Sequence, residues 1–77
     1  MTNSEIAERL EQLAILLELD GANPFRVRAY REAARVAAGA SGPLAAKVDE
    51  PGALEALPGI CKDLAGKIRD LVKTGST

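Results

Sequence analysis

The chain has 77 residues, which is enough for one domain, and its 47% hydrophobic and 27% charged content with a net charge of -1 is typical of globular proteins. A single cysteine and the lack of histidine exclude a disulfide framework, a Cys/His zinc site and histidine-based catalytic triads. No apolar run approaches the ~18 residues of a membrane span, and the first ten residues lack the features of a secretory signal, so the sequence predicts a cytoplasmic domain. Fourteen alanines against two aromatic residues favour helices over strands.

The first helix is predicted over residues 3–19. Thr2 and Glu5 fit a capping box, in which a hydroxyl and a carboxylate satisfy the first free amides reciprocally. Gly21 is placed to end the helix. The buried face is defined by apolar residues at helical spacing: Ile6, Leu10, Leu13, Ala14 and Leu17.

Two further long helices and two short ones are predicted in the remainder of the chain. Asn23-Pro24 is typical of a helix start and predicts a second helix over residues 24–38, which Gly39 ends. Short helices are expected around residues 44–48 and 52–57. The last helix is predicted over residues 62–74, before Gly75, with an apolar stripe made of Leu64, Ala65, Ile68, Leu71 and Val72.

Charge is segregated along the chain. The net charge is -4 over residues 1–20, +3 over residues 21–46, -2 over residues 47–55 and +2 over residues 56–77. An isoelectric point near 5.3 argues against tight binding to nucleic acid, whereas the two basic stretches leave weak or assisted binding open.

The segment between residues 57 and 62, LPGICK, joins two predicted helical segments. Pro58 fixes its own φ near -65°, and Gly59 can adopt a positive φ, which together favour a tight turn. Such a turn presents free amides at the start of the next helix, where an anion such as a nucleic-acid phosphate is stabilised. The alternative is a helix–helix turn that binds no ligand.

The sequence LPGICKDLAGKI resembles the helix-hairpin-helix motif, and LPGIG-type turns occur in many DNA-repair and recombination proteins. Upstream, NPFRVRAYREAAR and the first predicted helix, EIAERLEQLAILLEL, resemble the small N-terminal helix-hairpin-helix domain of X-family (beta-like) DNA polymerases, especially the bacterial type with a C-terminal PHP domain. The similarity extends over nearly the whole chain, and the upstream segment is much more specific than the turn.

This resemblance implies an all-α fold, with four main helices as two antiparallel pairs and the helix-hairpin-helix motif at the C-terminal end of a single domain, residues 1–77. It implies sequence-independent binding to the backbone of gapped, nicked or 5′-phosphorylated DNA in base excision repair. It also implies a Na+ or K+ ion held by the backbone carbonyls of Glu55, Leu57 and Ile60. No other cofactor is expected.

Two residues depart from the family pattern. Cys61 replaces the second glycine of the turn, at a cost of about 1–2 kcal/mol if that position needs a positive φ. Asp63 stands where the beta-polymerase branch has lysine. The chain contains no polymerase palm, so we expect either a part of an X-family DNA polymerase or a free-standing relative of its first domain.

Candidate DNA-binding residues fall into two groups. The first is the turn itself, with Gly59, Ile60, Cys61 and Lys62. The second is a stripe on the second helix formed by Arg28, Arg31 and Arg35, which lie within about 60° of one another at ~100° per residue. The alternative for each arginine is a solvated face or pairing with the acidic first helix. Tyr30 is expected at the edge of the core.

Lys67 matches the lysine that the family uses as the nucleophile of a 5′-deoxyribose-phosphate lyase, in which a neutral amine forms a Schiff base with the sugar aldehyde. Partial burial at the core boundary would favour the neutral amine. Asp63 and Asp70, four residues before and three residues after, would favour the ammonium. The alternative is an ordinary ion-paired lysine.

The sequence therefore predicts a DNA-binding domain of a bacterial, nucleoid-associated cytoplasmic protein, monomeric and without a membrane partner. The rival hypothesis is a protein-interaction module that keeps the fold without DNA affinity. The acidic isoelectric point and Cys61 favour this rival, and the clustered arginines favour DNA.

Overall fold

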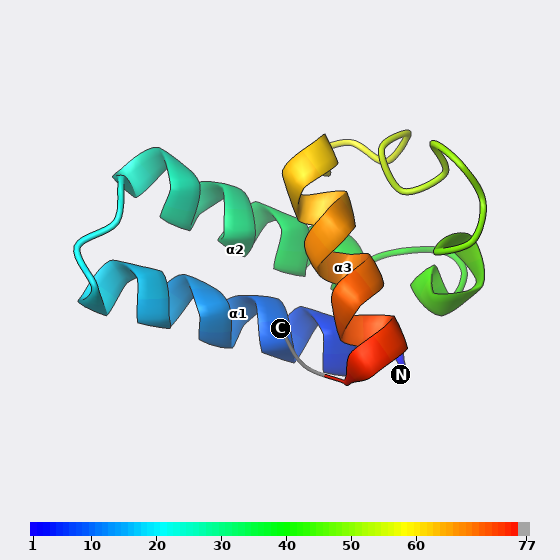
Figure 1. Ribbon diagram of the computed structural model, residues 1–77, viewed down its shortest axis with the longest axis horizontal. Coiled ribbons are helices and arrows are strands. Elements are labelled where there is room, and N and C mark those ends of the chain that lie inside the picture. Colours follow the sequence, from blue (N-terminus) through cyan, green and yellow to red (C-terminus); the bar gives the residue numbers. More distant parts are fainter. Residues whose placement is uncertain (76–77) are drawn as a thin grey trace.

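The computed structural model describes residues 1–75, and its regular elements there are all helical. They are α1 (Asn3–Leu19), α2 (Pro24–Ala38), a 3₁₀-helix η1 (Leu44–Lys47) and α3 (Lys62–Thr74). The predicted bounds of all three α-helices are confirmed. α1 and α2 form an antiparallel pair, and α3 crosses the end of this pair that lies away from their connecting turn (Figure 1). Within residues 1–75, no helix has the length and apolar character to cross a membrane.

Local capping explains where α1 begins and ends. The Thr2 hydroxyl oxygen accepts a hydrogen bond from the Glu5 amide (3.1 Å), and the Thr2 amide donates to the Glu5 carboxylate (3.0 Å), as the capping box requires. At the other end Gly21 has a φ of +78°, and its amide donates to the carbonyl of Glu18 (3.1 Å). This left-handed residue closes the helix because it redirects the chain while satisfying a terminal carbonyl.

Local capping also explains where α2 begins and ends. The Asn23 side-chain oxygen accepts a hydrogen bond from the Phe25 amide at 2.8 Å, and Pro24 occupies the first helical position, where no amide hydrogen is needed. Gly39 caps the C-terminus with its amide bonded to the Arg35 carbonyl at 3.1 Å.

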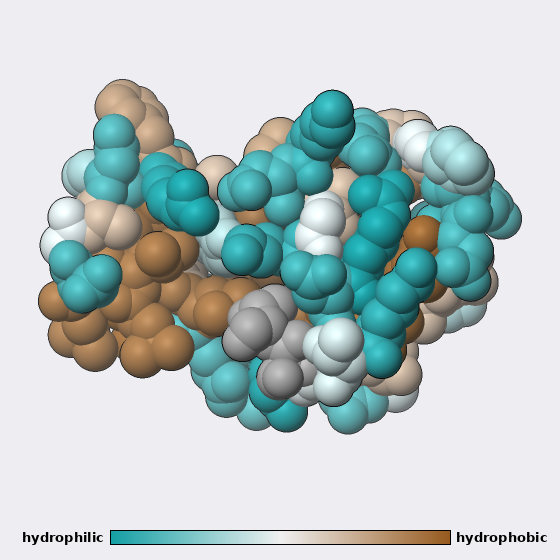
Figure 2. Space-filling model, viewed as in Figure 1, coloured by the Kyte–Doolittle hydropathy of each residue, from teal (hydrophilic) through white to brown (hydrophobic). Residues whose placement is uncertain are grey.

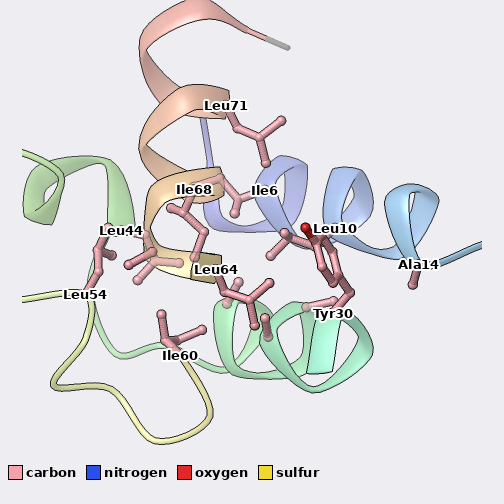
Figure 3. Packing of buried hydrophobic residues seen from close by; sticks show 14 of the residues in the cluster. Ile6, Leu10, Ala14, Tyr30, Leu44, Leu54, Ile60, Leu64, Ile68 and Leu71 are labelled. Carbon is pink, nitrogen blue, oxygen red and sulfur yellow. The ribbon is translucent and has the colours of Figure 1, made fainter. Parts of the chain in front are cut away.

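The hydrophobic core lies between α3 and the α1–α2 pair. Leu64, Ile68 and Leu71 of α3 point toward the α1 residues Ile6 and Leu10 (Figure 3). Tyr30 of α2 is only 3% exposed and lies inside this core. The remaining cluster members are small residues of the helices and apolar residues of the connecting segment: Ala14, Val27, Ala33, Ala34, Ala37, Leu44, Val48, Leu54, Ile60 and Ala65. Leu13 and Leu17, which were predicted on the buried face of α1, are only partly buried.

The predicted helix over residues 52–57 is absent from the described chain, and the expectation of four main helices in two antiparallel pairs is therefore wrong. These residues form consecutive turns, with amide-to-carbonyl bonds from Ala53 to Glu50 (3.2 Å) and from Ala56 to Gly52 (3.0 Å). Gly52 has a φ of +76°, which interrupts a right-handed helix. The expected helix around residues 44–48 forms the single 3₁₀ turn η1.

An arginine of α3 holds this irregular segment in place. Arg69 donates through Nε to the Val48 carbonyl (3.2 Å) and through Nη2 to the Glu55 carboxylate (3.0 Å). The two side chains are 26% and 32% exposed, so the pair is partly shielded from water. The hydrogen bond from Arg69 lowers the pKa of the Glu55 carboxyl below its ordinary value.

We predict that Glu55 makes the stability of the protein sensitive to acid. Because its pKa is lower in the folded than in the unfolded chain, its pairing stabilises the fold above the unfolded value, about 4.3, and this contribution is lost as the pH falls through the folded value. The difference in unfolding free energy between the wild type and Glu55→Gln should therefore be constant from neutral pH to about pH 5 and shrink below about pH 4.

Urea denaturation across this pH range measures the difference. Glu11→Gln is the matched control, because Glu11 is exposed and makes no ion pair within residues 1–75. A gap between wild type and Glu55→Gln that persists unchanged to about pH 3 would contradict the assignment of the Arg69 pair.

Candidate nucleic-acid interface

The connection into α3 is a tight turn over residues 57–60. The Ile60 amide donates to the Leu57 carbonyl at 3.2 Å, and Gly59 adopts a φ of +83°. With Pro58 and Gly59 at the two central positions, this arrangement is that of a type II β-turn. The turn that the sequence predicts is therefore present.

Gly59 also lies in close contact with α2. A Cβ atom added to Gly59 would be 3.1 Å from Cγ of Glu32 and 3.4 Å from Cγ2 of Val36. Both the backbone conformation and the space thus favour glycine at this position. The contact fixes the turn, and hence the start of α3, relative to α2.

Ile60 and Cys61 connect the turn to the helix. Ile60 is 4% exposed and anchors the turn in the core. Cys61 is the N-cap residue of α3, with φ -83° and ψ 173°, and its carbonyl accepts a hydrogen bond from the Ala65 amide at 2.8 Å. Because this conformation is ordinary extended backbone, cysteine causes no left-handed strain where the family motif has glycine. The Cys61 thiol is exposed and makes no capping hydrogen bond.

The first turn of α3 presents unsatisfied hydrogen-bond donors. The amides of Lys62, Asp63 and Leu64 precede the first intrahelical bond of α3 and have no acceptor within residues 1–75. The Lys62 side chain is exposed and makes no ion pair in that part of the chain. Oriented amides with an adjacent ammonium group can bind an anion.

A second cation, which the sequence analysis did not identify, lies at the same place. The Arg26 guanidinium is 3.9 Å from the Asp63 carboxylate and lies 5.8 Å from the centre of the Tyr30 ring. Arg26 thereby offsets the negative charge of Asp63 at the start of α3. Arg26 and Asp63 are distant in sequence, so local patterns do not predict this ion pair. The sequence shows only that Arg26 lies one helical turn before Tyr30, which permits the contact between their side chains.

The predicted arginine stripe lies on the flank of α2 that faces α1. Arg31 pairs with Glu18 of α1 at 3.3 Å, as the alternative of pairing with the acidic first helix predicts. Arg35 donates to both oxygens of Glu32, and these hydrogen bonds raise the pKa of Arg35. Two of the three arginines therefore already have carboxylate partners on the protein.

Arg28 differs from the other two members of the stripe. Its guanidinium lies 5.9 Å from the centre of the exposed Phe25 ring, and it makes no ion pair within the part of the chain that the structure describes. Arg28 is thus the stripe residue that can contact a phosphate without first breaking an ion pair.

Lys67 lies on α3 at the edge of the core and is half-buried. The expected pairing with Asp63 or Asp70 is not observed, since Lys67 makes no ion pair within residues 1–75. Asp63 is directed to Arg26 instead.

The residues implied as cation ligands border one shallow pocket. Glu55, Leu57 and Ile60 line it together with residues of the turn and of the adjacent helices, namely Ala29, Gly59, Cys61 and Leu64. The Leu57 carbonyl accepts the turn hydrogen bond and retains a second lone pair, and the Glu55 carboxylate is held by Arg69. Backbone carbonyls are the ligands that suit a monovalent cation. Within residues 1–75 no cluster of three His, Cys, Asp or Glu side chains could hold a metal ion.

Comparison with models of known protein families matches the chain to the helix-hairpin-helix domain over residues 1–77. The chain therefore belongs to the helix-hairpin-helix domain family. Domains of this family commonly bind DNA without sequence specificity. None of the curated proteins with which the chain was compared matches it.

We predict that Gly59→Ala destabilises the protein more than Gly52→Ala. Both glycines have positive φ values, +83° and +76°, so both substitutions incur a left-handed strain of about 1–2 kcal/mol. Only at Gly59 does the new methyl group meet α2, whereas a Cβ at Gly52 has no atom within 4 Å. Urea denaturation should show an excess loss of about 1 kcal/mol for Gly59→Ala. Equal losses would show that the turn is not tightly packed on α2.

Proposed function

We propose that the domain binds the DNA backbone at gaps, nicks or 5′-phosphorylated ends, and that it serves DNA repair as part of, or as a free-standing relative of, an X-family DNA polymerase. The observation that supports this most directly is the start of α3, where unsatisfied amides and the Lys62 ammonium lie beside Arg26. The polymerase relationship rests on the resemblance of residues 23–35 and 57–68 to the first domain of that family.

A preference for terminal phosphate follows from charge. A terminal phosphate carries about -1.5 to -2 charges at pH 7, whereas a backbone diester carries one. The start of α3 offers several donors within one small area, which suits a compact dianion better than a long row of diesters.

The net charge of the molecule favours a limited contact with DNA. The chain carries -1 overall, and α1 contains four of its eleven acidic residues. An extended contact with duplex DNA would bring these carboxylates near phosphates, at an electrostatic cost. A gap or nick allows the strand end to reach the start of α3 while the duplex stays away from α1.

A bound Na+ or K+ is part of the proposal. The carbonyls of Glu55, Leu57 and Ile60 would hold it at the shallow pocket beside the turn, where its charge would add to that of Lys62. The Glu55 carboxylate would keep its pair with Arg69, because the proposed ligand is the backbone carbonyl of Glu55.

We predict that Lys62→Gln weakens binding to gapped, 5′-phosphorylated DNA, whereas the matched variant Lys73→Gln does not. Lys73 lies at the other end of α3 and pairs with Asp49 at 3.6 Å. With one to three phosphate contacts, the plot of log K against log salt should have a slope of about -1 to -3 for the wild type and should become shallower by about one unit in Lys62→Gln.

Fluorescence anisotropy over a range of salt concentrations gives both the binding constant and the slope of log K against log salt. Identical slopes for Lys62→Gln and Lys73→Gln would refute a phosphate contact at the start of α3. If the wild type does not bind gapped DNA even at about millimolar protein, the protein-interaction module becomes the better account.

Lyase activity is a second candidate function. It is favoured by the half-buried position of Lys67 and by the absence of an ion pair from Lys67 to Asp63 or Asp70 in the described chain. The neutral amine of Lys67 would attack the aldehyde of a 5′-deoxyribose phosphate and form a Schiff base with loss of water.

We predict that borohydride traps a covalent adduct between the wild type and DNA carrying a 5′-deoxyribose phosphate, and that Lys67→Ala abolishes it, because the amine that forms the Schiff base is lost. Lys47→Ala is the control for the loss of a lysine elsewhere, and denaturing gel electrophoresis detects the adduct. An adduct that survives Lys67→Ala would exclude Lys67 as the nucleophile. Failure of the wild type to form any adduct would leave the domain with binding alone.

A further inference from the structure

The C-terminal half of α1 is apolar on nearly all sides. Between residues 13 and 19 only Glu18 is polar. Leu16 is 61% exposed, Leu19 is 80% exposed and Ile15 is 49% exposed. A helix that is apolar all round is normally covered by other protein. Exposed leucines of this kind therefore indicate a contact surface.

The position of α3 explains why this surface is open. α3 packs on the part of α1 that carries Ile6 and Leu10, as the close-up of the core shows (Figure 3). It leaves the remainder of α1, toward the α1–α2 turn, uncovered on the same side (Figure 1). Figure 2 shows the brown, apolar surface gathered over this end of the molecule, beside the hydrophilic surface of α3. α3 thus projects from the surface next to the exposed apolar end of α1, and we call this projection the step.

Three residues of α1 and its C-cap residue form what we call the α1 stripe: Arg9, Leu13, Leu16 and Asp20. Their spacings of four, three and four residues place them within about 60° of one another around the helix, and Asp20 is its C-cap residue. Arg9 and Asp20 are exposed, and neither makes an ion pair within residues 1–75. The stripe therefore has a basic end, an apolar centre and an acidic end.

This order of charges is complementary to that of a second α1 stripe that runs in the opposite direction, because the basic end of each stripe then meets the acidic end of the other. In an antiparallel pair of α1 helices, a residue and its opposite number have positions that add up to 29, so Arg9 lies opposite Asp20 and Leu13 lies opposite Leu16. Each of these contacts occurs twice about a two-fold axis. A parallel pair would instead place like charges opposite each other.

We propose that two copies of this chain associate through the α1 stripe, with their α1 helices antiparallel. The leucines form the apolar centre of the interface, and Arg9 of each copy pairs with Asp20 of the other. The turn between α1 and α2 of one copy lies beside the step formed by α3 of the other copy. This replaces the monomer expected from the sequence, and it leaves the Leu57–Ile60 turn, which packs on α2, uncovered.

A second copy fits the stripe better than an unrelated partner because both charged ends are matched at once. The other acidic residues of α1 reinforce this choice. Glu8 and Glu11 line a groove between α1 and α2 on another side of the helix, so they do not meet their own counterparts across the proposed interface. The charges that do meet are of opposite sign.

Sedimentation equilibrium of the full chain from about 10 µM to about 1 mM measures the dimer dissociation constant Kd. We expect a concentration-dependent dimer. Leu16→Glu should raise Kd by at least about tenfold because it places a carboxylate in the apolar centre. Arg9→Glu and Asp20→Arg should each raise Kd by about tenfold, since each places like charges opposite one another twice.

The decisive experiment mixes the Arg9→Glu variant with the Asp20→Arg variant. In the mixed pair both end contacts are again between opposite charges, so the heterodimer should form with a Kd near that of the wild type. Glu11→Arg is the control, because it makes the same change of charge as Asp20→Arg outside the stripe, and it should leave Kd within about twofold of the wild type. All four substituted residues are exposed in the single chain, so the variants are expected to keep the fold, which circular dichroism checks.

Three results would overturn the proposal. The first is a wild type that stays monomeric to about 1 mM. The second is a Kd that rises as much with Glu11→Arg as with Asp20→Arg, which would show only a response to net charge. The third is a mixture of the two charge variants that stays monomeric, which would exclude the antiparallel register.

Discussion

The architecture depends on the tight turn at Gly59. Its φ of +83° reverses the chain, and its close approach to Glu32 and Val36 fixes the turn against α2. Where α3 begins, and therefore where its free amides lie, follows from this contact. Ile60 completes the anchor because its burial ties the turn to the same core that holds the apolar side of α3. The candidate interface is thus positioned by the packing of the turn on α2 and on the core.

Charge is distributed so that an acidic molecule keeps one small electropositive area. Four of its six arginines are already paired on the protein, Arg26 with Asp63, Arg31 with Glu18 of α1, Arg35 with Glu32 and Arg69 with Glu55. The start of α3 is different, because there the Lys62 ammonium and the helix amides act together. Local charge and backbone orientation, rather than net charge, therefore determine what the domain can bind.

Most of the fold could be predicted from local signals, whereas part of the candidate site could not. The helix bounds follow from caps such as the Thr2 hydroxyl and Asn23-Pro24, whose energies depend on neighbouring residues alone. Residues 52–57 were mispredicted as a helix because Arg69 holds the segment around them, through contacts across 14–21 residues. Arg26 was missed for the same reason, since its partner Asp63 is adjacent only after α3 has packed. The turn itself was predictable because its two central residues, proline and glycine, restrict the backbone directly.

The most direct test of the account is a titration of the protein with short gapped DNA, followed by nuclear magnetic resonance of the backbone amides. Two DNAs that differ only in a 5′ phosphate or a 5′ hydroxyl at the gap isolate the contribution of the terminal phosphate. The account predicts that the phosphate-dependent shifts centre on residues 59–65, at the start of α3, and are small in α1. Shifts that are equal for the two DNAs, or that centre on the Arg28 flank of α2 instead, would contradict the claim that the start of α3 binds the phosphate.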